Sequence, residues 1–292
     1  MPVPQFDYIA PKRVDEAVAA LVEGGKETRV MAGGTDLLVK IRHRMLFPKR
    51  IVSLKQIEGL DAITFDKNTG LTIGATALLA DVAAHRSIRR YYPTVADAAQ
   101  STANVQVRNM GTVVGNLCNA SPSADNAPTL MAMGATVNIT GPTGSHRMAL
   151  DQFFQGPGIT ALKTGEIVTS ICVPLPPAGS GTAYYSLSQR GKLDCSAVGV
   201  GTMVTLKGNR CMDVRLIVGA CAPVPMRTLG AEKMLIGKKM TDTLIRKTAQ
   251  AASKETSPIT DVRASAPYRW KIVAVLTIRA LADARKMALG KR

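Results

Sequence analysis

The stretch Ala32-Gly33-Gly34-Thr35-Asp36-Leu37-Leu38 decides the fold, because it joins two different kinds of element. The β-prone residues 28–31 precede it, and one apolar helical face follows it, marked by Leu37, Leu38, Ile41, Met45 and Leu46. The pattern predicts a strand, a glycine turn and a helix. Backbone N–H groups can point outward from such a turn, which suits an anion such as a pyrophosphate. A double glycine is also common in a plain tight connection, so this segment alone leaves both interpretations open.

The spacing of this segment excludes two familiar nucleotide-binding motifs. It has neither the G-x-G-x-x-G pattern nor the lysine of G-x-x-x-x-G-K-[ST], so it favours neither a Rossmann fold nor a P-loop. A second segment, residues 108–125, is rich in glycine, asparagine and serine. Its short polar side chains can donate to phosphate or hydroxylated groups, and Asp125 can accept from hydroxyls. It could equally be a long loop that satisfies its own backbone.

The remaining pattern predicts an α+β protein. Val14, Ala17, Val18 and Leu21 mark a helix that Gly24-Gly25 ends, and Thr76 is the expected cap of a helix that ends near His85. A further helix, a loop at 109–126 and a helix from about Pro128 follow. Strands are expected at 50–54, 62–65, 71–75, 137–140, 167–173, 197–206 and 214–221, with turns at 66–70 and 207–210. The last helices are expected at 231–236, 243–254 and 268–289.

The proline- and glycine-rich residues 174–181 are the best linker in the chain. We therefore predict two domains, 1–177 and 178–292, which agrees with a length of 292 residues.

The net charge of +16 is concentrated near the C-terminus, where residues 205–292 hold 18 Lys and Arg against 6 Asp and Glu. These basic residues occur singly or in pairs with little aromatic interleaving, which disfavours a nucleic-acid partner. An acidic partner protein, an anionic nucleotide or an ordinary solvated surface all fit this charge.

Cysteines and histidines indicate no metal site on this chain. The five cysteines are widely spaced and form no C-x-x-C pair, which is typical of reduced thiols in the cytoplasm. His43, His85 and His146 have no cysteine or carboxylate at ligand spacing. No apolar run reaches about 18 residues, and no signal-peptide pattern opens the chain, so we expect neither a membrane span nor secretion.

Taken together, several segments resemble the paired signature of the FAD-binding subunits of the xanthine dehydrogenase and carbon monoxide dehydrogenase family of molybdenum hydroxylases. The matching stretches are Ala32 to Leu38, Leu71-Thr72-Ile73-Gly74-Ala75-Thr76, Arg108-Asn109-Met110-Gly111-Thr112 through Asn116, Ala120 to Asp125, and Gly165-Glu166-Ile167-Val168. They span most of the first 177 residues.

The resemblance implies an FAD held between two subdomains, roughly 1–55 and 56–177, in a fold similar to the flavin domain of vanillyl-alcohol oxidase. It implies a smaller α+β C-terminal domain. It also implies partner subunits that carry molybdenum-pterin and [2Fe-2S] clusters, with electrons passing through FAD to NAD or another acceptor. Two such clusters need about eight cysteines, so five unclustered ones place the clusters on other chains.

The resemblance also assigns cofactor-binding residues. Ala32, Gly33, Gly34, Thr35, Asp36 and Leu37 would wrap the pyrophosphate. Thr112, Gly115, Asn116 and Asn119 would contact phosphate and the ribityl chain, Asp125 would bind ribityl hydroxyls, and Val168 would lie near a ring. None of them is an acid–base catalyst.

Two departures from the family pattern stand out. Val114-Gly115 replaces two adjacent glycines, and Ser186 stands near the place of a frequent lysine, a positive charge that Arg190 or Lys192 could supply. The absence of a cysteine-rich insertion disfavours the relatives that bind a [4Fe-4S] cluster. The alternatives are a stand-alone FAD-dependent oxidoreductase acting on its own substrate, and a basic binding module without a cofactor.

Overall fold

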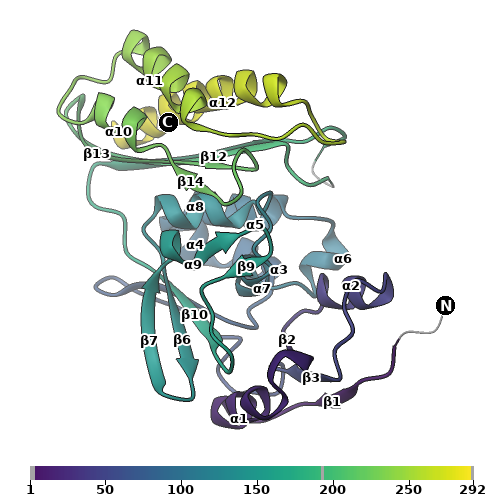
Figure 1. Cartoon of the computed structure of the whole chain (residues 1–292). Coiled ribbons are helices and arrows are strands. Elements are labelled where there is room, and N and C mark those ends of the chain that lie inside the picture. Colours follow the sequence, from purple (N-terminus) through teal and green to yellow (C-terminus); the bar gives the residue numbers. More distant parts are fainter. Residues whose placement is uncertain (1–3, 192–193, 291–292) are drawn as a thin grey trace.

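The computed structural model describes residues 4–191 and 194–290. The described residues form a three-stranded parallel sheet, a five-stranded antiparallel sheet, a four-stranded antiparallel sheet and a two-stranded ribbon, each combined with helices. Figure 1 shows these parts following one another along the molecule, with the four-stranded sheet and its helices at one end. The predicted α+β class is confirmed.

The N-terminal part is a small parallel sheet with strand order β1-β3-β2. Ala17, Val18 and Leu21 form the buried face of its first helix, and Gly25, with φ of +49°, follows the last helical residue. Strand β2 coincides with the predicted strand. The elements are β1 (Asp7–Ile9), α1 (Val14–Gly24), the 3-10 turn η1 (Gly25–Glu27), β2 (Thr28–Met31), α2 (Leu37–Arg42) and β3 (Arg50–Ser53).

The helix after the glycine turn is shorter than predicted. Arg44 has φ of +56°, and the N–H of Met45 donates to the carbonyl of Lys40 at 2.9 Å, which closes the last turn of α2. Ile41 is buried, whereas the side chain of Met45 is 74% exposed. The apolar face predicted to run to Leu46 is therefore wrong beyond Ile41, because the left-handed residue turns the chain away.

The middle part is the antiparallel sheet β4-β5-β10-β6-β7. The predicted hairpin at 66–70 is confirmed, with Asp66 opposite Gly70 and the N–H groups of Asn68 and Thr69 donating to the Asp66 carboxylate. Strands β7 and β8–β9 were not predicted. The bounds are β4 (Ile63–Asp66), β5 (Gly70–Gly74), β6 (Thr136–Gly141), β7 (Gly144–Ala149), α9 (Leu150–Phe153), β8 (Phe154–Gly156), β9 (Ile159–Thr160) and β10 (Ile167–Val173).

A group of short helices packs against this sheet. Thr76 does not cap the first of them: Leu78 occupies the N-cap position, and the N–H of Thr76 donates to the Leu60 carbonyl. The predicted loop at 109–126 contains a helix, and the following helix begins at Asn126 rather than at Pro128. The helices are α3 (Leu79–Ala84), α4 (Arg86–Tyr91), α5 (Pro93–Ser101), α6 (Val105–Arg108), α7 (Val113–Cys118) and α8 (Asn126–Ala132).

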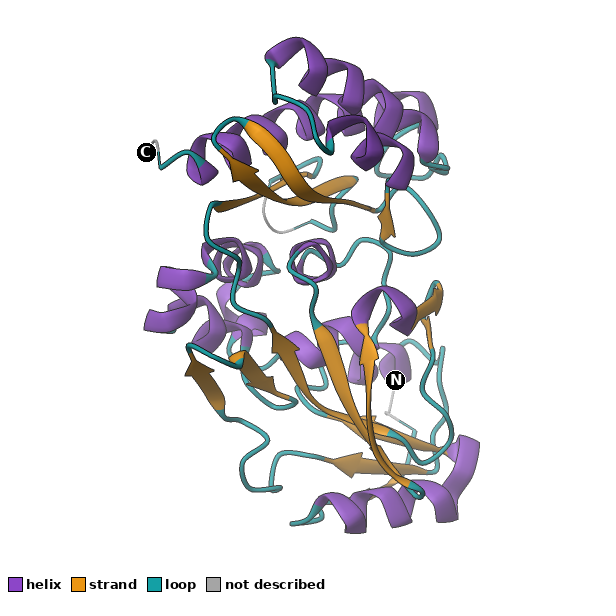
Figure 2. Cartoon of the chain, turned by 90° about the vertical axis from the view of Figure 1, so that its left-hand side faces the viewer, coloured by secondary structure: helices purple, strands orange, loops and turns teal. Residues whose placement is uncertain are grey.

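The C-terminal part is the antiparallel sheet β11-β12-β13-β14. The predicted turn at 207–210 joins β12 to β13, but β11 begins inside the predicted linker, at Ser180. Figure 2 shows helices covering its outer face. The bounds are β11 (Ser180–Leu187), β12 (Val198–Lys207), β13 (Arg210–Gly219), β14 (Met226–Arg227), α10 (Leu229–Leu235), α11 (Asp242–Glu255) and α12 (Ala266–Ala288).

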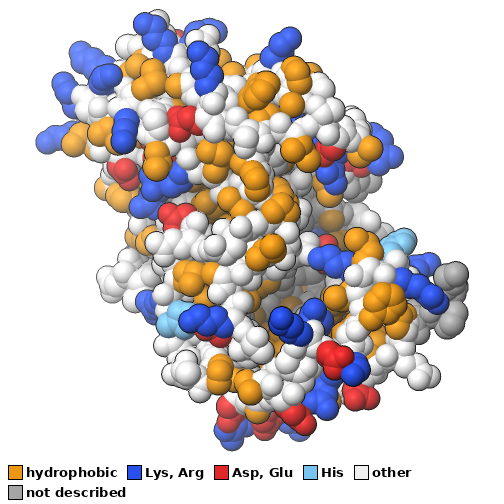
Figure 3. All heavy atoms as spheres, viewed as in Figure 1, with side chains coloured by type: hydrophobic (Ala, Val, Ile, Leu, Met, Phe, Trp, Pro, Cys, Tyr) orange, Lys and Arg blue, Asp and Glu red, His pale blue; other side chains and the backbone are white. Residues whose placement is uncertain are grey.

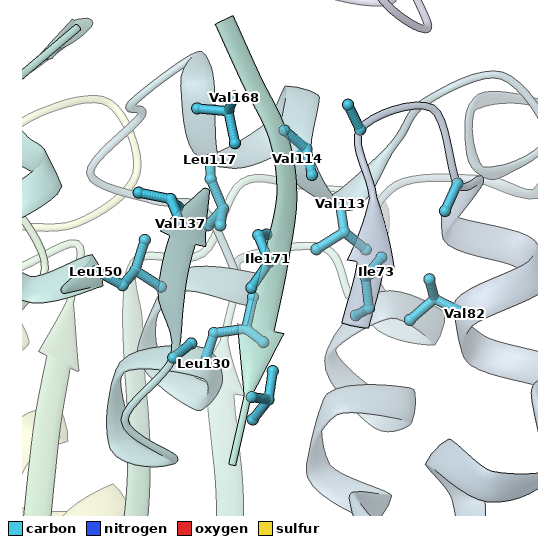
Figure 4. Close-up of a cluster of buried hydrophobic side chains, with 14 of the residues drawn as sticks. Ile73, Val82, Val113, Val114, Leu117, Leu130, Val137, Leu150, Val168 and Ile171 are labelled. Atoms are coloured by element: carbon cyan, nitrogen blue, oxygen red, sulfur yellow. The ribbon is translucent and has the colours of Figure 1, made fainter. Parts of the chain in front are cut away.

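Two hydrophobic cores correspond to the two halves of the chain. The first gathers side chains from residues 17–173 together with Met203 and Ile217, and the second lies between the C-terminal sheet and its helices. Figure 4 shows part of the first core, with Val114, Leu117 and Val168 close together. Helix α8 packs against β12 so closely that a Cβ on Gly201 would lie 2.6 Å from the Pro128 carbonyl oxygen. The two halves therefore share a tight contact along α8.

Candidate functional site

A cavity of about 620 Å³ lies where the N-terminal part meets the helices of the middle part. In Figure 3 the surface is hollowed beside α2, and Lys and Arg side chains surround the hollow. All twelve residues predicted to bind a cofactor line this cavity. They are Ala32, Gly33, Gly34, Thr35, Asp36, Leu37, Thr112, Gly115, Asn116, Asn119, Asp125 and Val168.

The glycine turn meets the second polar segment directly. A Cβ on Gly33 would lie 2.1 Å from the carbonyl oxygen of Met110 and 2.7 Å from the Cα of Gly111, so only glycine fits there. Gly34 has φ of +74°, in the left-handed region. Among the described residues, no acceptor is found for the backbone N–H groups of residues 33–36. Backbone donors that lack a protein acceptor and line a cavity are a feature of anion-binding sites.

The opposite wall is helix α7 and the turn that follows it. The Thr112 hydroxyl caps this helix by accepting from the N–H of Gly115 at 2.9 Å. Asn116 accepts from the Asn126 side chain at 3.0 Å, and Asn119 accepts from the Lys40 ammonium at 2.7 Å. The Lys40 bond joins α2 to the end of α7 and holds a cation at the cavity.

Asp125 contacts the C-terminal half of the chain. Its Oδ1 accepts from the Tyr184 hydroxyl at 2.5 Å and from the Ser196 hydroxyl at 2.6 Å. Burial raises the pKa of Asp125, while the two hydroxyl donors oppose that rise. Burial also holds the pKa of Tyr184 well above its usual value, so this hydroxyl keeps its proton and remains a donor.

Apolar side chains complete the cavity and account for one departure from the family pattern. Val168 is buried at a bulge in β10 and contributes to the wall. Val114 also lines the cavity, and its side chain is buried in the first core. The valine that replaces a glycine therefore adds core packing at this wall.

Sequence reasoning missed several polar residues of this region, among them Lys40, Tyr184 and Ser196. Lys40 stands one helical turn after Asp36, which was a usable signal for a cation near the glycine turn. Tyr184 and Ser196 lie in the other half of the chain and carry no motif, so no sequence spacing could have placed them beside Asp125.

Arg190 and Lys192 were the two candidates for the positive charge that is absent at Ser186. Ser186 is exposed and lies beside a smaller cavity of about 230 Å³. Arg190 is paired with Asp194 at 2.8 Å, and its side chain is 84% exposed, so it lies in solvent. Lys192 lies outside the described residues.

Two cysteines, Cys118 and Cys195, line the cavity. Burial raises the pKa of Cys118 to about 12, so this thiol is protonated near neutral pH, while Cys195 is exposed. We expect iodoacetamide at pH 8 to alkylate Cys118 at least about tenfold more slowly than Cys195, because the thiolate is the nucleophile. Peptide mass spectrometry over time measures both rates. Equal rates would contradict the raised pKa of Cys118.

Residues 4–191 and 194–290 contain no group of three or more His, Cys, Asp or Glu side chains arranged to hold a metal ion. None of the helices in these ranges combines the length and the apolar character needed to cross a bilayer.

Comparisons with known proteins agree with this geometry. Residues 4–176 match the family model described as "FAD binding domain in molybdopterin dehydrogenase", and residues 183–284 match "CO dehydrogenase flavoprotein C-terminal domain". The glyceraldehyde dehydrogenase medium chain of Sulfolobus acidocaldarius is 33% identical over 280 residues, which cover 96% of this chain and 98% of that one. The xanthine dehydrogenase FAD-binding subunit of Escherichia coli O157:H7 is 27% identical, covering 98% and 99%.

A solved structure of carbon monoxide dehydrogenase from Hydrogenophaga pseudoflava, which lacks the Mo-pyranopterin moiety of its cofactor, contains a similar chain. The TM-score is 0.94 at 31% identity, with 97% of this chain and 98% of that chain covered. Both halves of the fold are thus matched, and the resemblance seen in the sequence is confirmed. This chain belongs to the FAD-binding medium subunits of the xanthine dehydrogenase and carbon monoxide dehydrogenase family, and residues 4–176 are its FAD-binding domain.

Proposed function

We propose that this chain is the electron-transfer subunit of a multi-subunit molybdenum hydroxylase, carrying electrons from [2Fe-2S] clusters on a partner through FAD to NAD or another acceptor. The observation that carries the proposal is the meeting of the two predicted segments across one cavity, with Gly33 against Met110 and Gly111. When bound, FAD supplies the ability to take up and release electrons. The residues of this chain bind and orient it.

The residues around the cavity suit the parts of FAD. The unpaired N–H groups of residues 33–36 and the Lys40 ammonium would hold the pyrophosphate. Asp125 would accept from ribityl hydroxyls, and Val168 offers an apolar surface to a ring. A cavity of about 620 Å³ is within the usual range for cofactor sites, roughly 300–1,000 Å³.

The chemistry of the cysteines supports partner subunits for the clusters. Among residues 4–191 and 194–290, no three cysteines or other ligand side chains are arranged around one point, whereas each cluster needs about four cysteine ligands. All five cysteines are free thiols, which fits a cytoplasmic complex. The proposal keeps the division into domains 1–177 and 178–292, since the linker separates the two sheets.

Lys40 provides a direct test of the pyrophosphate site. We expect Lys40→Met to weaken FAD binding about tenfold, because a charge-assisted bond to a phosphate is lost. Lys49→Met is the matched control: Lys49 pairs with Glu27 on the surface, and its side chain is 76% exposed. Titration of the apo-chain with FAD, followed by flavin fluorescence, measures both dissociation constants. Equal affinities would contradict the placement of the pyrophosphate.

The whole proposal is tested by purifying the chain with its native partners. We expect a yellow complex that releases FAD and contains iron and molybdenum. Its flavin colour should bleach when the substrate of the hydroxylation is added. Addition of NADH to the same complex tests the acceptor. NADH bleaches the flavin only if the complex can transfer electrons between FAD and the nicotinamide. A chain that binds FAD and turns over a substrate unaided would instead support the stand-alone oxidoreductase, and colourless preparations would overturn FAD binding.

A further inference from the structure

Asp125 is held by residues from the other half of the chain. It occupies the N-cap position of α8, yet its side chain makes no capping bond. Instead Oδ1 accepts from Tyr184 on β11 and from Ser196, two residues before β12 begins. The Asp125 side chain is thus bound by the C-terminal half of the chain and not by its own helix.

Both hydroxyls donate to the same carboxylate oxygen. Among residues 4–191 and 194–290, no hydrogen bond to Oδ2 is present, and Asp125 lines the main cavity. Two donors on Oδ1 fix the rotation of the carboxylate, which leaves Oδ2 as the oxygen available to a ligand. An acceptor that is already oriented loses less conformational entropy when the ligand binds.

We propose that Tyr184 and Ser196 are positioning residues that hold Asp125 for the hydroxylated chain of the bound flavin, so that the C-terminal domain sets the FAD affinity of the N-terminal one. This inference rests on the proposed function. Ser196 is buried, with 4% of its side chain exposed, and Tyr184 lies on the strand that follows the linker. Neither residue lines the cavity near the glycine turn, so their effect on FAD passes through Asp125.

Tyr185 provides a matched control. Its hydroxyl also donates to a carboxylate, that of Asp283 on α12, but this pair is at the surface and away from the cavity. Tyr184→Phe and Tyr185→Phe therefore remove the same chemical group from neighbouring positions of one strand. Only Tyr184→Phe removes a bond to a residue that lines the cavity, namely Asp125.

The test is FAD titration of the full-length apo-chain. We expect Tyr184→Phe and Ser196→Ala each to raise the dissociation constant about tenfold, which is the scale of a lost bond to a charged acceptor, and Tyr185→Phe to leave it unchanged. In an Asp125→Asn background, Tyr184→Phe should add less than about a twofold change, because the residue acts through the carboxylate. Thermal unfolding of each apo-variant separates this effect from a loss of folded protein.

Two results would overturn the inference. One is full FAD affinity of Tyr184→Phe, whatever its apo-chain melting temperature, and the other is an undiminished effect of Tyr184→Phe in the Asp125→Asn background. If the wild-type chain binds FAD normally and either result is found, only the inference fails and the proposed function is unaffected. A wild-type chain that binds no FAD would overturn the proposed function and this inference with it.

Discussion

A Gly33→Ala variant should fold but purify almost free of FAD. The added methyl group would lie 2.1 Å from the Met110 carbonyl oxygen and 2.7 Å from the Gly111 Cα, and both of these are backbone atoms that cannot rotate away. Relief therefore requires the glycine turn to move away from the second segment. Forced overpacking costs about 1–3 kcal/mol, which corresponds to as much as a hundredfold loss of affinity when the strain is concentrated in the binding geometry.

The FAD content of the purified protein, measured as the ratio of flavin to protein absorbance, checks this expectation. Gly156→Ala is the control, because a Cβ there would meet only the Ile159 side chain, at 3.6 Å, an ordinary contact. It should retain FAD like the wild type. Full FAD content in Gly33→Ala would show that the two segments need not approach closely for binding.

The cavity wall could be predicted from sequence because its residues occur in two compact segments. A glycine turn between a strand and a helix requires specific residue types in consecutive positions, so the turn is visible locally, whereas its role in cofactor binding came from the resemblance to the family. The same holds for residues 112–125, where short polar side chains follow one another. Eleven of the twelve predicted residues belong to these two segments, and Val168 on β10 is the exception.

The end of helix α2 and the start of strand β11 could not be predicted from the local sequence. Helix α2 ends at Arg42 because Arg44 adopts a left-handed conformation, although no glycine or asparagine there signals a stop. Strand β11 begins at Ser180 within a proline- and glycine-rich stretch that looked like a pure linker. Its pairing with β12 provides the partner that local sequence could not show.

Contacts between the two halves were invisible for a different reason. Tyr184 and Ser196 approach Asp125 only after two sheets and α8 have packed together. No periodicity or spacing encodes that meeting, since the residues are separated by most of a domain. Side-chain contacts of this kind follow from tertiary packing alone.

Arg269→Met should be the most destabilising single substitution among those considered. The guanidinium is 2% exposed and donates to the carbonyls of Ala197 and Ala220, both at 2.7 Å, and to Asp261 at 2.6 Å. Methionine fills a similar volume but leaves the two carbonyls without their charged donor and removes the buried cation from Asp261. Breaking a buried ion pair in this way costs about 3–5 kcal/mol. We expect the melting temperature to fall by roughly 10 °C.

Arg263→Met is the control, because Arg263 binds the same carboxylate at 3.1 Å from a position that is 41% exposed. Exposed pairs contribute about 0–1 kcal/mol, so this variant should melt close to the wild type. Differential scanning calorimetry compares the three proteins. Similar melting temperatures for both variants would contradict a special role for the buried arginine.

The pH dependence of the Arg269→Met effect follows from Asp261. Burial alone would raise the pKa of this carboxyl, but the Arg263 N–H and the Arg269 guanidinium outweigh it and lower the pKa to about 2, from an ordinary value of 3.8. A carboxyl whose pKa is lowered on folding contributes stability that is fully present above pH 3.8 and is lost as the pH falls through about 2. The difference in urea midpoint between wild type and variant should therefore be smaller at pH 3 than at pH 7.

The same substitution connects stability to the cavity. Arg269 holds the carbonyl of Ala197, the residue next to Ser196, and that of Ala220, whose N–H donates to the Pro122 carbonyl at 2.7 Å. Both contacts lie within a few residues of the hydroxyl and the carboxylate that meet at Asp125. Arg269→Met should therefore lower FAD affinity even at temperatures where the protein stays folded, whereas Arg263→Met should lower neither stability nor affinity, because its exposed side chain binds neither carbonyl.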